Sequence, residues 1–457
     1  MKKLLSFAIG LVCTASLFAG GIENKTNMST GYLRNPSRNT ENQRPDAAFY
    51  NIAGTAFMKN GLYLGVGNQF VAKEYKNTLR TDDFSSYGFG SGTSYNDETF
   101  VFFYPDAEIV YKHNQYAIFA NFGIYAGGGK LEYSEGTSAT ALAFALSNKS
   151  KADSYAQQAA AASAAGNTSA AATAAAAASR YESAATSALG AAKDHSLTVN
   201  SITYGEQIGA SVRFNDYVSF AGAIRLLQGT QKMSISSDYL AALGNGSDEI
   251  SYNAFAFGVS PVFGIHAKPI DRLDASFQYQ MATQMHYKLS DVEGNIASSF
   301  GIENDKEFRS DLAHVLNFGL GYQLLDPLYL STSFNLYINS DSEMNTVLSE
   351  NDYDNSFEIA LGADYRFNKT FLASLGAAYG HQGTNDDSNN TFNPVLDSLQ
   401  VGGGLEISIF EDMVLNLGAT YVNYFNRDYY LNKTYRTELS KKLFMFSLGF
   451  TYHFAGI

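Results

Sequence analysis

The chain has 457 residues, of which 14% are aromatic and only 16% are charged, and it contains 40 glycines but no tryptophan. Ordinary soluble domains carry about 25% charged residues, so this composition excludes a typical cytosolic enzyme. The formal net charge of −13 repels a phosphate backbone and argues against nucleic acid as a partner. Past the N-terminus there is no apolar run of the about 20 residues that a helical membrane span needs. What remains is a large β protein rich in Tyr, Phe and Gly.

Residues 1–19 have the pattern of an export signal. They open with the basic pair Lys2 and Lys3, continue with an apolar stretch, and end at Ala19, a small residue that suits signal peptidase. Cys13, the one cysteine of the chain, lies inside this segment. We therefore predict a signal peptide and a mature chain with neither a disulfide nor a thiol nucleophile.

Alternation of apolar and polar side chains is the main structural signal in the rest of the chain. Across residues 444–454, aromatic and aliphatic side chains occupy every second position, and residues 356–367 alternate in the same way with their charges on one face. Successive side chains of a strand point to opposite faces, so both segments predict strands with one apolar face. A soluble sandwich or barrel gives the same period, and alternation alone does not separate it from a membrane barrel.

The lengths of the connections do separate these two architectures. Short turns alternate with long connections that are rich in Asn, Asp, Ser and Gly, as in outer-membrane barrels with short periplasmic turns and long surface loops. The sequence therefore predicts an all-β fold, an antiparallel transmembrane β-barrel of about 14 strands over residues 61–457, in the outer membrane of a Gram-negative-type bacterium. The predicted strands are 61–75, 97–113, 115–134, 195–214, 217–237, 251–268, 272–289, 306–325, 328–341, 353–367, 370–383, 396–410, 412–428 and 437–454.

Residues 20–60 precede the first strand and lack strand periodicity. Within them, Arg44–Phe57 is apolar enough to be buried and has turn-forming residues at Asn51 and Gly54. The lumen of so large a barrel is too wide for wall side chains alone to fill. We therefore expect residues 20–60 to form an N-terminal helical hatch, or plug, inside the barrel.

The plug segment also carries a family motif. The stretch DAAFYNIAGTA from Asp46 to Ala56, followed by a glycine-rich first strand, resembles the hatch motif of the FadL/TodX family of outer-membrane transporters for hydrophobic compounds. In that family an Asp-Ala pair leads into aromatic residues and then Asn-Pro-Ala-Gly. Ile52 stands here where the family usually has Pro, so the turn loses a fixed φ and gains an amide donor.

The resemblance implies passive uptake of hydrophobic small molecules such as long-chain fatty acids. These molecules would enter at the surface loops, bind above the hatch and leave sideways through an opening at a kink in the third strand. The resemblance also implies hatch and ligand-binding roles for Asp46, Phe49, Tyr50, Asn51, Ala53 and Gly54.

The third strand gives an independent physical indication of such an exit. Gly127, Gly128 and Gly129 interrupt a wall that should face lipid. Glycines weaken strand pairing, allow bulges and leave no side chain to block a gap. These three residues are therefore candidates for a lateral portal. A bulge or a close approach to the plug, without an opening, would use the same residues.

Residues 138–193, between the third and fourth strands, are dominated by alanine, the residue with the highest helix propensity. Gly166-Asn167 reads as a helix stop, and Thr168-Ser169 as caps of a second helix. We predict an antiparallel helical hairpin on the extracellular rim. It is either a lid or docking element over the entrance or a tolerated expansion of a surface loop.

Sequence motifs for catalysis do not occur. The seven histidines are scattered, and the chain has no HExxH, GxSxG or Walker pattern. We therefore expect no enzyme, no cofactor and no metal site. Six charged residues on the inward face of predicted strands are expected to anchor the plug or to line a polar lumen. They are Arg225, Asp274, Glu358, Asp364, Arg366 and Glu406.

The preferred interpretation is a monomeric passive channel whose partners are hydrophobic small molecules or fatty acids, together with outer-membrane lipid and lipopolysaccharide. Two other functions stay open. One is a surface adhesin or structural barrel that uses the alanine-rich hairpin, and the other is a general porin for small solutes.

Overall fold

The computed structural model describes residues 22–80, 92–189, 195–237, 249–295, 297–347, 350, 353–384, 389, 391, 394–431 and 434–455. The predicted signal peptide, residues 1–19, lies outside the described residues.

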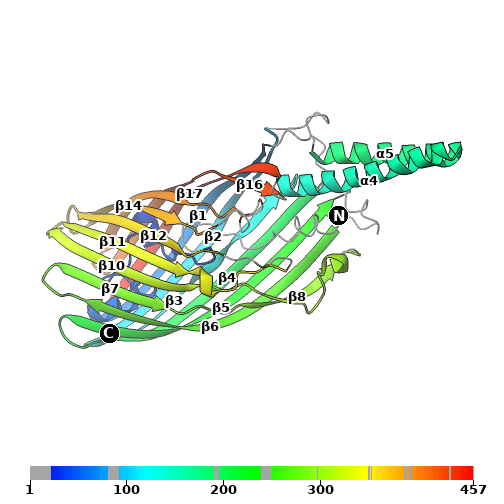
Figure 1. Ribbon diagram of the computed structural model, residues 1–457. Coiled ribbons are helices and arrows are strands. Elements are labelled where there is room, and N and C mark those ends of the chain that lie inside the picture. Colours follow the sequence, from blue (N-terminus) through cyan, green and yellow to red (C-terminus); the bar gives the residue numbers. More distant parts are fainter. Residues whose placement is uncertain are drawn as a thin grey trace.

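The described strands form one antiparallel sheet that closes into a barrel (Figure 1). The last strand pairs with the first from Phe454 opposite Leu62 to Thr437 opposite Leu79. The strands are β1 (Gly61–Leu79), β2 (Ser94–His113), β3 (Tyr116–Tyr133), β4 (His195–Arg213), β5 (Val218–Ser237), β6 (Glu249–Ala267), β7 (Leu273–Gln280), β8 (His286–Glu293), β9 (Glu307–Arg309), β10 (His314–Leu325), β11 (Leu328–Ile338), β12 (Ser356–Arg366), β13 (Phe371–His381), β14 (Ser398–Phe410), β15 (Met413–Tyr424), β16 (Arg427–Leu431) and β17 (Tyr435–Phe454).

Three wall strands are interrupted, so the 17 strand segments make 14 wall strands. β7 and β8 both pair with β6, and β10 and β9 pair with β7 and β8 in turn. β15 and β16 both pair with β17. The predicted number of strands is confirmed, and each predicted range overlaps one wall strand. The interruptions were not predicted.

Pro261 in β6 explains the interruption between β7 and β8. The ladder reaches Val262 opposite Gln280 and would continue with Pro261 opposite Met281. The amide of Met281 donates to the carbonyl oxygen of Pro261 at 3.1 Å, but proline has no N–H to return the bond. Nη2 of Arg225 donates to the Met281 carbonyl at 2.9 Å instead, and the regular ladder ends there.

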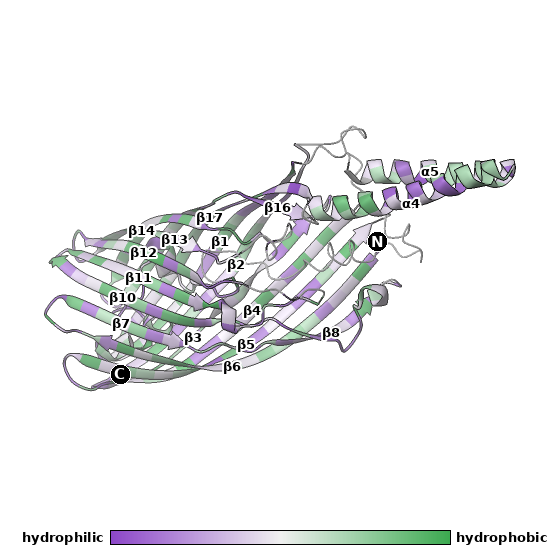
Figure 2. Cartoon of the chain, in the orientation of Figure 1, coloured by the Kyte–Doolittle hydropathy of each residue, from purple (hydrophilic) through white to green (hydrophobic). Residues whose placement is uncertain are grey.

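Hydrophobic and hydrophilic residues alternate along the wall strands (Figure 2), and many large apolar side chains of these strands are exposed. In β17, Phe444 and Phe446 are exposed, whereas the alternate Leu443 and Met445 are buried. So continuous an exposed apolar surface is typical of a lipid-facing wall. The predicted direction of the alternation, with aromatic side chains outward, is confirmed.

The plug, residues 22–60, lies inside the barrel (Figure 1). It contains α2 (Thr30–Arg34), α3 (Ala47–Tyr50) and the 3-10 helix η1 (Ile52–Phe57). The side chain of Ser29 caps α2 by accepting from the amide of Tyr32. Asp46 precedes α3 but makes no side-chain cap bond, because its carboxylate accepts from Arg38 at 2.7 Å instead.

The alanine-rich segment forms the predicted antiparallel hairpin of α4 (Ser138–Ala164) and α5 (Thr168–Leu189), which projects beyond the barrel (Figure 1). Gly166 ends the first helix with φ +75°. The expected cap of the second helix was wrong: Oδ1 of Asn167 accepts from the amide of Ala170 at 3.0 Å, so Asn167 caps α5. Two further 3-10 helices, η3 (Ala297–Phe300) and η4 (Asn339–Asp341), complete the fold. No helix among the described residues is long and apolar enough to cross a membrane.

Candidate functional site

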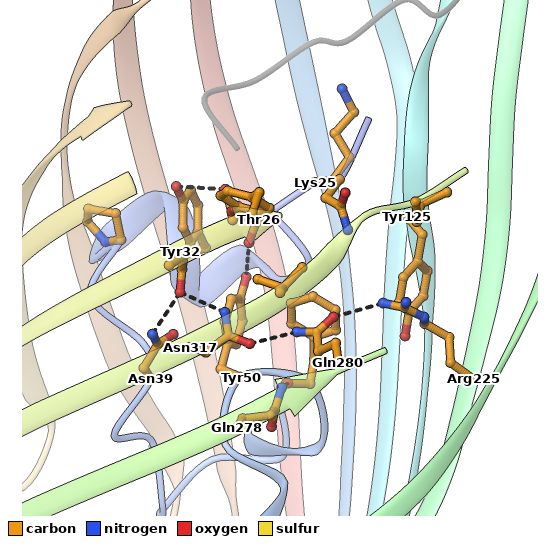
Figure 3. A pocket seen from close by; sticks show the side chains of 17 residues that line it. Lys25, Thr26, Tyr32, Asn39, Tyr50, Tyr125, Arg225, Gln278, Gln280 and Asn317 are labelled. Carbon is orange, nitrogen blue, oxygen red and sulfur yellow. Dashed lines mark hydrogen bonds between the residues drawn. The ribbon is translucent and has the colours of Figure 1, made fainter. Parts of the chain in front are cut away.

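A narrow chamber lies between the plug and one side of the barrel wall, where residues of β3, β5, β7, β10 and β11 face the plug (Figure 3). Aromatic rings from both parts line it together with amide side chains and two cationic groups. The lining includes Lys25, Tyr32, Phe49, Tyr50, Tyr125, Arg225, Gln278, Gln280, Asn317, Asn335 and Tyr337. The chamber therefore offers apolar ring surface and hydrogen-bonding groups at the same level of the lumen.

The aromatic part of the chamber is built around Phe49. Its ring packs edge-on against Tyr50 at 4.9 Å and against Tyr125 of β3 at 5.6 Å between centroids. The hydroxyl of Tyr50 donates to the carbonyl of Thr26 at 2.6 Å and accepts from the amide of Met28 at 2.8 Å. These bonds fix the plug rings in place, and edge-to-face packing is the preferred geometry of such pairs.

Arg225 of β5 is the largest fully buried side chain of the described residues. It donates to Oγ of Ser260 at 3.2 Å, Oε1 of Gln280 at 2.8 Å, the Met281 carbonyl at 2.9 Å and Oγ1 of Thr283 at 2.8 Å. The guanidinium also lies 5.7 Å from the Tyr125 ring centroid. All four acceptors are neutral, so among the described residues no carboxylate bonds directly to the buried charge.

A chain of amides runs from Arg225 across the chamber to Glu358. Gln280 donates to Asn317 at 2.9 Å, Asn317 donates to Asn335 at 2.7 Å, and Asn335 donates to Oε1 of Glu358 at 3.2 Å. Figure 3 shows the first of these bonds together with the bond from Arg225 to Gln280. Every amide donates in the same direction, toward the carboxylate. The side-chain orientations are therefore set by a donor, Arg225, at one end and an acceptor, Glu358, at the other.

The wall opens between β2 and β3 at the level of the chamber. The two strands pair only from His113 opposite Tyr116 to Ala107 opposite Phe122. Above that level β2 stays paired with β1, and β3 stays paired with β4. The β3–β4 ladder is irregular between Ile124 and Ala126 and again between Gly127 and Gly129.

The predicted portal glycines lie at this split. Gly127 and Gly129 have φ +75° and +76°, which favours glycine. A Cβ at Gly127 would lie 2.4 Å from the Ser201 carbonyl oxygen. Gly128 is the bulged residue between them. The structure thus brings the three glycines together with Tyr125, a chamber residue that sequence reasoning missed.

Side chains and the plug form hydrogen bonds with backbone groups of β3 that are not paired with β2. Tyr104 donates to the Ile124 carbonyl at 3.3 Å, and Asp97 accepts from the amide of Glu132 at 2.7 Å. The amide of Lys25, in the plug, donates to the Tyr125 carbonyl at 3.0 Å. The gap between the strands is therefore closed by side chains and by the plug rather than by a ladder.

The six predicted hatch residues divide into two groups. Phe49 and Tyr50 line the chamber, and the other four hold the plug together or bind it to the wall. Asp46 accepts from Arg38 and from Oγ of Ser29. The carbonyl of Ala53 accepts from Ser219 at 2.7 Å.

Asn51 and Gly54 form the tight turn of the hatch. Asn51 donates to Nδ1 of His266 at 2.8 Å and accepts from the amide of Gly54 at 3.2 Å. A Cβ at Gly54 would lie 2.4 Å from the Glu41 carbonyl oxygen. This close approach requires glycine.

Several of the inward charges contact the plug, as expected. Arg34 pairs with Asp364 at 3.3 Å. Glu406 lies 3.6 Å from Arg34 and accepts from Nε of Arg44 at 2.9 Å. Asp274 accepts from Asn42 at 2.8 Å. These pairs tie the plug to β7, β12 and β14.

The other three inward charges, Arg366, Glu358 and Arg225, have different partners. Arg366 lies 3.8 Å from Glu406. Glu358 accepts from Thr26 at 3.3 Å and from Tyr32 at 3.4 Å, both in the plug. Arg225 differs from this group because its hydrogen bonds go to the wall and its side chain faces the chamber.

Lys25 is a second residue that the sequence did not identify, because the segment before α2 has no motif. Burial lowers the pKa of Lys25 to about 7, with Glu23 acting in the opposite direction. Higher in the lumen, Nζ of Lys441 lies 4.8 Å from the Tyr75 ring centroid and 4.5 Å from that of Tyr424. Buried amines and aromatic rings thus lie close together in the lumen.

Comparisons with known proteins agree with this architecture. Residues 275–454 match the family model described as outer membrane protein beta-barrel domain. No curated protein matches the chain. A Pseudomonas aeruginosa FadL homologue superposes with a TM-score of 0.65 at 14% identity, covering 96% of this chain and 99% of that chain.

Two further solved structures are similar. The P. putida toluene transporter TodX has a TM-score of 0.60 at 13% identity, covering 92% of this chain and 97% of its own. The CymD monoaromatic hydrocarbon channel has a TM-score of 0.54 at 10% identity, covering 94% and 99%. The chain is therefore an outer-membrane β-barrel protein of the Gram-negative type, and its fold resembles that of the FadL/TodX family.

Proposed function

We propose that the protein is a channel for passive uptake of hydrophobic small molecules across the outer membrane. The proteins with the same fold include a toluene transporter and a monoaromatic hydrocarbon channel. The observation that carries the proposal in this chain is Tyr125, which lines the chamber and also lies in the irregular part of β3 where the wall splits. Uptake by this route needs no catalytic residue and no cofactor, so we propose that the protein is not an enzyme.

The buried Arg225 favours an amphipathic ligand with one anionic head group, such as a long-chain fatty acid. A buried charge costs free energy unless it is paired, and Arg225 has only neutral hydrogen-bond partners. A carboxylate placed beside it would supply the missing counter-charge. The rings of Phe49, Tyr50 and Tyr125 would then contact the alkyl chain.

We propose that the ligand leaves sideways between β2 and β3. Wherever a ladder is intact, lateral passage requires breaking consecutive backbone hydrogen bonds. Above Ala107 and Phe122 these two strands share none, so passage there needs side chains to move and the plug to release the Tyr125 carbonyl from the amide of Lys25, but no ladder to break. Outside the gap, Phe102 and Phe103 are 72% and 70% exposed, which gives the exit an apolar outer edge.

The test is uptake of a radiolabelled fatty acid by a strain that lacks the gene, with and without the plasmid-borne gene. Restored uptake at unchanged ionic conductance in planar bilayers is the expected result. Equal uptake in both strains would contradict the proposal. Large steady conductance of the purified protein would favour the porin instead.

A further inference from the structure

The alanine-rich hairpin has two structurally different parts. Its first residues, Thr137–Asn148, are here named the foot, and the remainder of α4 with α5 is named the arm. The foot is almost entirely buried, with Leu142 at 0% and Phe144 at 1% exposure. The arm projects beyond the rim (Figure 1), and its side chains are mostly exposed.

The foot lies in the extracellular mouth of the barrel. The amide of Ser138 donates to Oδ1 of Asn77, near the upper end of β1, at 2.7 Å. Oγ1 of Thr137 and Oγ1 of Thr391, from the connection between β13 and β14, are 3.0 Å apart. Nδ2 of Asn77 donates to the Thr391 carbonyl at 3.0 Å. The foot thus joins β1 to the connection between β13 and β14.

The foot also continues the apolar interior downward. Leu142 and Phe144 belong to the same buried cluster as Phe49, Tyr50 and Tyr125 of the chamber. A hydrophobic molecule that enters from outside would meet the foot before it reaches the chamber. The foot therefore lies at the outer end of this buried apolar cluster.

Two buried hydroxyl groups of the foot are not satisfied by the described residues while it lies in the mouth. The hydroxyls of Ser138 and Ser147 are buried and find no hydrogen-bond partner among the described residues. Water would satisfy both groups once the foot left the mouth, which lowers the cost of unseating it. Gly136, with φ +69°, separates the foot from β3 and supplies a point where the backbone can turn.

The arm is stiff enough to move as one body with the foot. Tyr155 of α4 stacks on Tyr181 of α5, with 5.5 Å between the ring centroids and an interplanar angle of 6°. Nζ of Lys151 lies 5.2 Å from the Tyr181 ring centroid. Since α4 continues from foot to arm without a break, a tilt of the arm displaces the foot.

We propose that the foot is a reversible lid on the extracellular mouth, and that the arm is the lever that moves it. This role rests on the proposed uptake function. Ligand passes when the foot lifts about Gly136, and the mouth is closed when the foot is seated. The alternative is a fixed stopper that never moves.

A disulfide lock tests the lid. Thr137→Cys with Thr391→Cys places two thiols where the hydroxyls are 3.0 Å apart, and a disulfide needs a separation of about 2.0 Å between sulfurs. The matched control is Ser196→Cys with Ser236→Cys, whose hydroxyls are 2.8 Å apart between β4 and β5. The one native cysteine, Cys13, lies in the predicted signal peptide.

We expect the oxidised lock to lower fatty-acid uptake at least ~10-fold and a reductant to restore it. The oxidised control pair should change uptake less than ~2-fold. Uptake unchanged in a fully oxidised lock, with disulfide formation verified by gel shift, would overturn the lid. Parent protein that gives no uptake would instead count against the proposed function.

A second experiment tests whether the foot leaves the mouth without measuring transport. Three single-cysteine variants are labelled on intact cells with a membrane-impermeant maleimide: Thr137→Cys in the foot, Ser163→Cys on the exposed arm and Thr55→Cys buried in the plug. A moving lid predicts a foot rate at least ~10-fold above the plug rate and well below the arm rate. A foot rate equal to either control would overturn the proposal.

Discussion

The backbone amide of Ile52 donates to Oε1 of Gln278 at 3.1 Å, while Nε2 of Gln278 donates to the Phe49 carbonyl at 2.9 Å. One wall side chain therefore binds both ends of the hatch turn. Proline at position 52 would remove the first bond, because it has no N–H. The departure from the Asn-Pro-Ala-Gly motif thus creates a contact between plug and wall.

We predict that Ile52→Pro destabilises the plug. The buried oxygen of Gln278 would lose its donor, at a cost of about 1–3 kcal/mol, against a gain of about 0.4–1 kcal/mol from the restricted unfolded chain. Urea unfolding in detergent would measure the difference in the free energy of unfolding. Gln278→Leu should destabilise more than Ile52→Pro, because it also removes the donor to the Phe49 carbonyl. An Ile52→Pro variant more stable than the parent by the full proline gain would show that this bond contributes nothing.

The wall could be predicted from sequence because its signal is repeated. Each strand has two faces in different solvents, so alternation appears in residues such as Phe444 and Met445, and fourteen strands average out local exceptions. The interruptions could not be predicted in the same way. Pro261 was visible inside a predicted strand, but only the structure shows that Arg225 bonds to the carbonyl that proline leaves unpaired.

The candidate site was less predictable than the wall for a related reason. The hatch motif pointed to Phe49 and Tyr50, since both lie in one short segment. Tyr125, Arg225 and Lys25 come from three segments far apart in the chain. Their meeting depends on barrel closure and on the path of the plug, which no local pattern encodes.

Arg225→Met should weaken binding of anionic ligands selectively. A hydrogen bond to a charged group contributes about 1.5–3 kcal/mol, which corresponds to about 10- to 100-fold in affinity. A neutral alkane of equal chain length should bind the variant and the parent alike, and this comparison removes any general loss of folding. Calorimetric titration in lipid nanodiscs would measure both ligands. Equal losses for the two ligands would contradict a head-group role.

Binding of an anionic ligand should also weaken as pH rises through neutrality. The pKa of Lys25 is about 7, so its amine is mostly protonated at pH 6 and mostly neutral at pH 8. An alkyl sulfonate keeps its charge over this range, so a loss of up to about tenfold between pH 7 and 8 would come from the protein. The affinity of Lys25→Met for the sulfonate should not depend on pH. Lys59→Met, changed at an exposed position, should keep the pH dependence of the parent. If the affinity of Lys25→Met still falls as pH rises, a group other than Lys25 causes the pH dependence.

Val101→Trp should block the proposed lateral exit. A Cβ built on Gly129 would lie 3.9 Å from Cγ2 of Val101, so Val101 borders the gap from the β2 side and an indole there would fill it. Replacing the glycines themselves is a poorer test, because positive φ at Gly127 and Gly129 strains any side chain. Ile118→Trp is the matched control, since Ile118 is 60% exposed on β3 where the ladder to β2 is intact. We expect uptake to fall several-fold in Val101→Trp, which corresponds to a rise of about 1 kcal/mol in the barrier to passage. Uptake by Ile118→Trp should be normal, and Val101→Trp should still bind ligand in the chamber. Normal uptake in a folded Val101→Trp barrel would place the exit elsewhere, because the widened side chain would then stand in a gap that the ligand does not use.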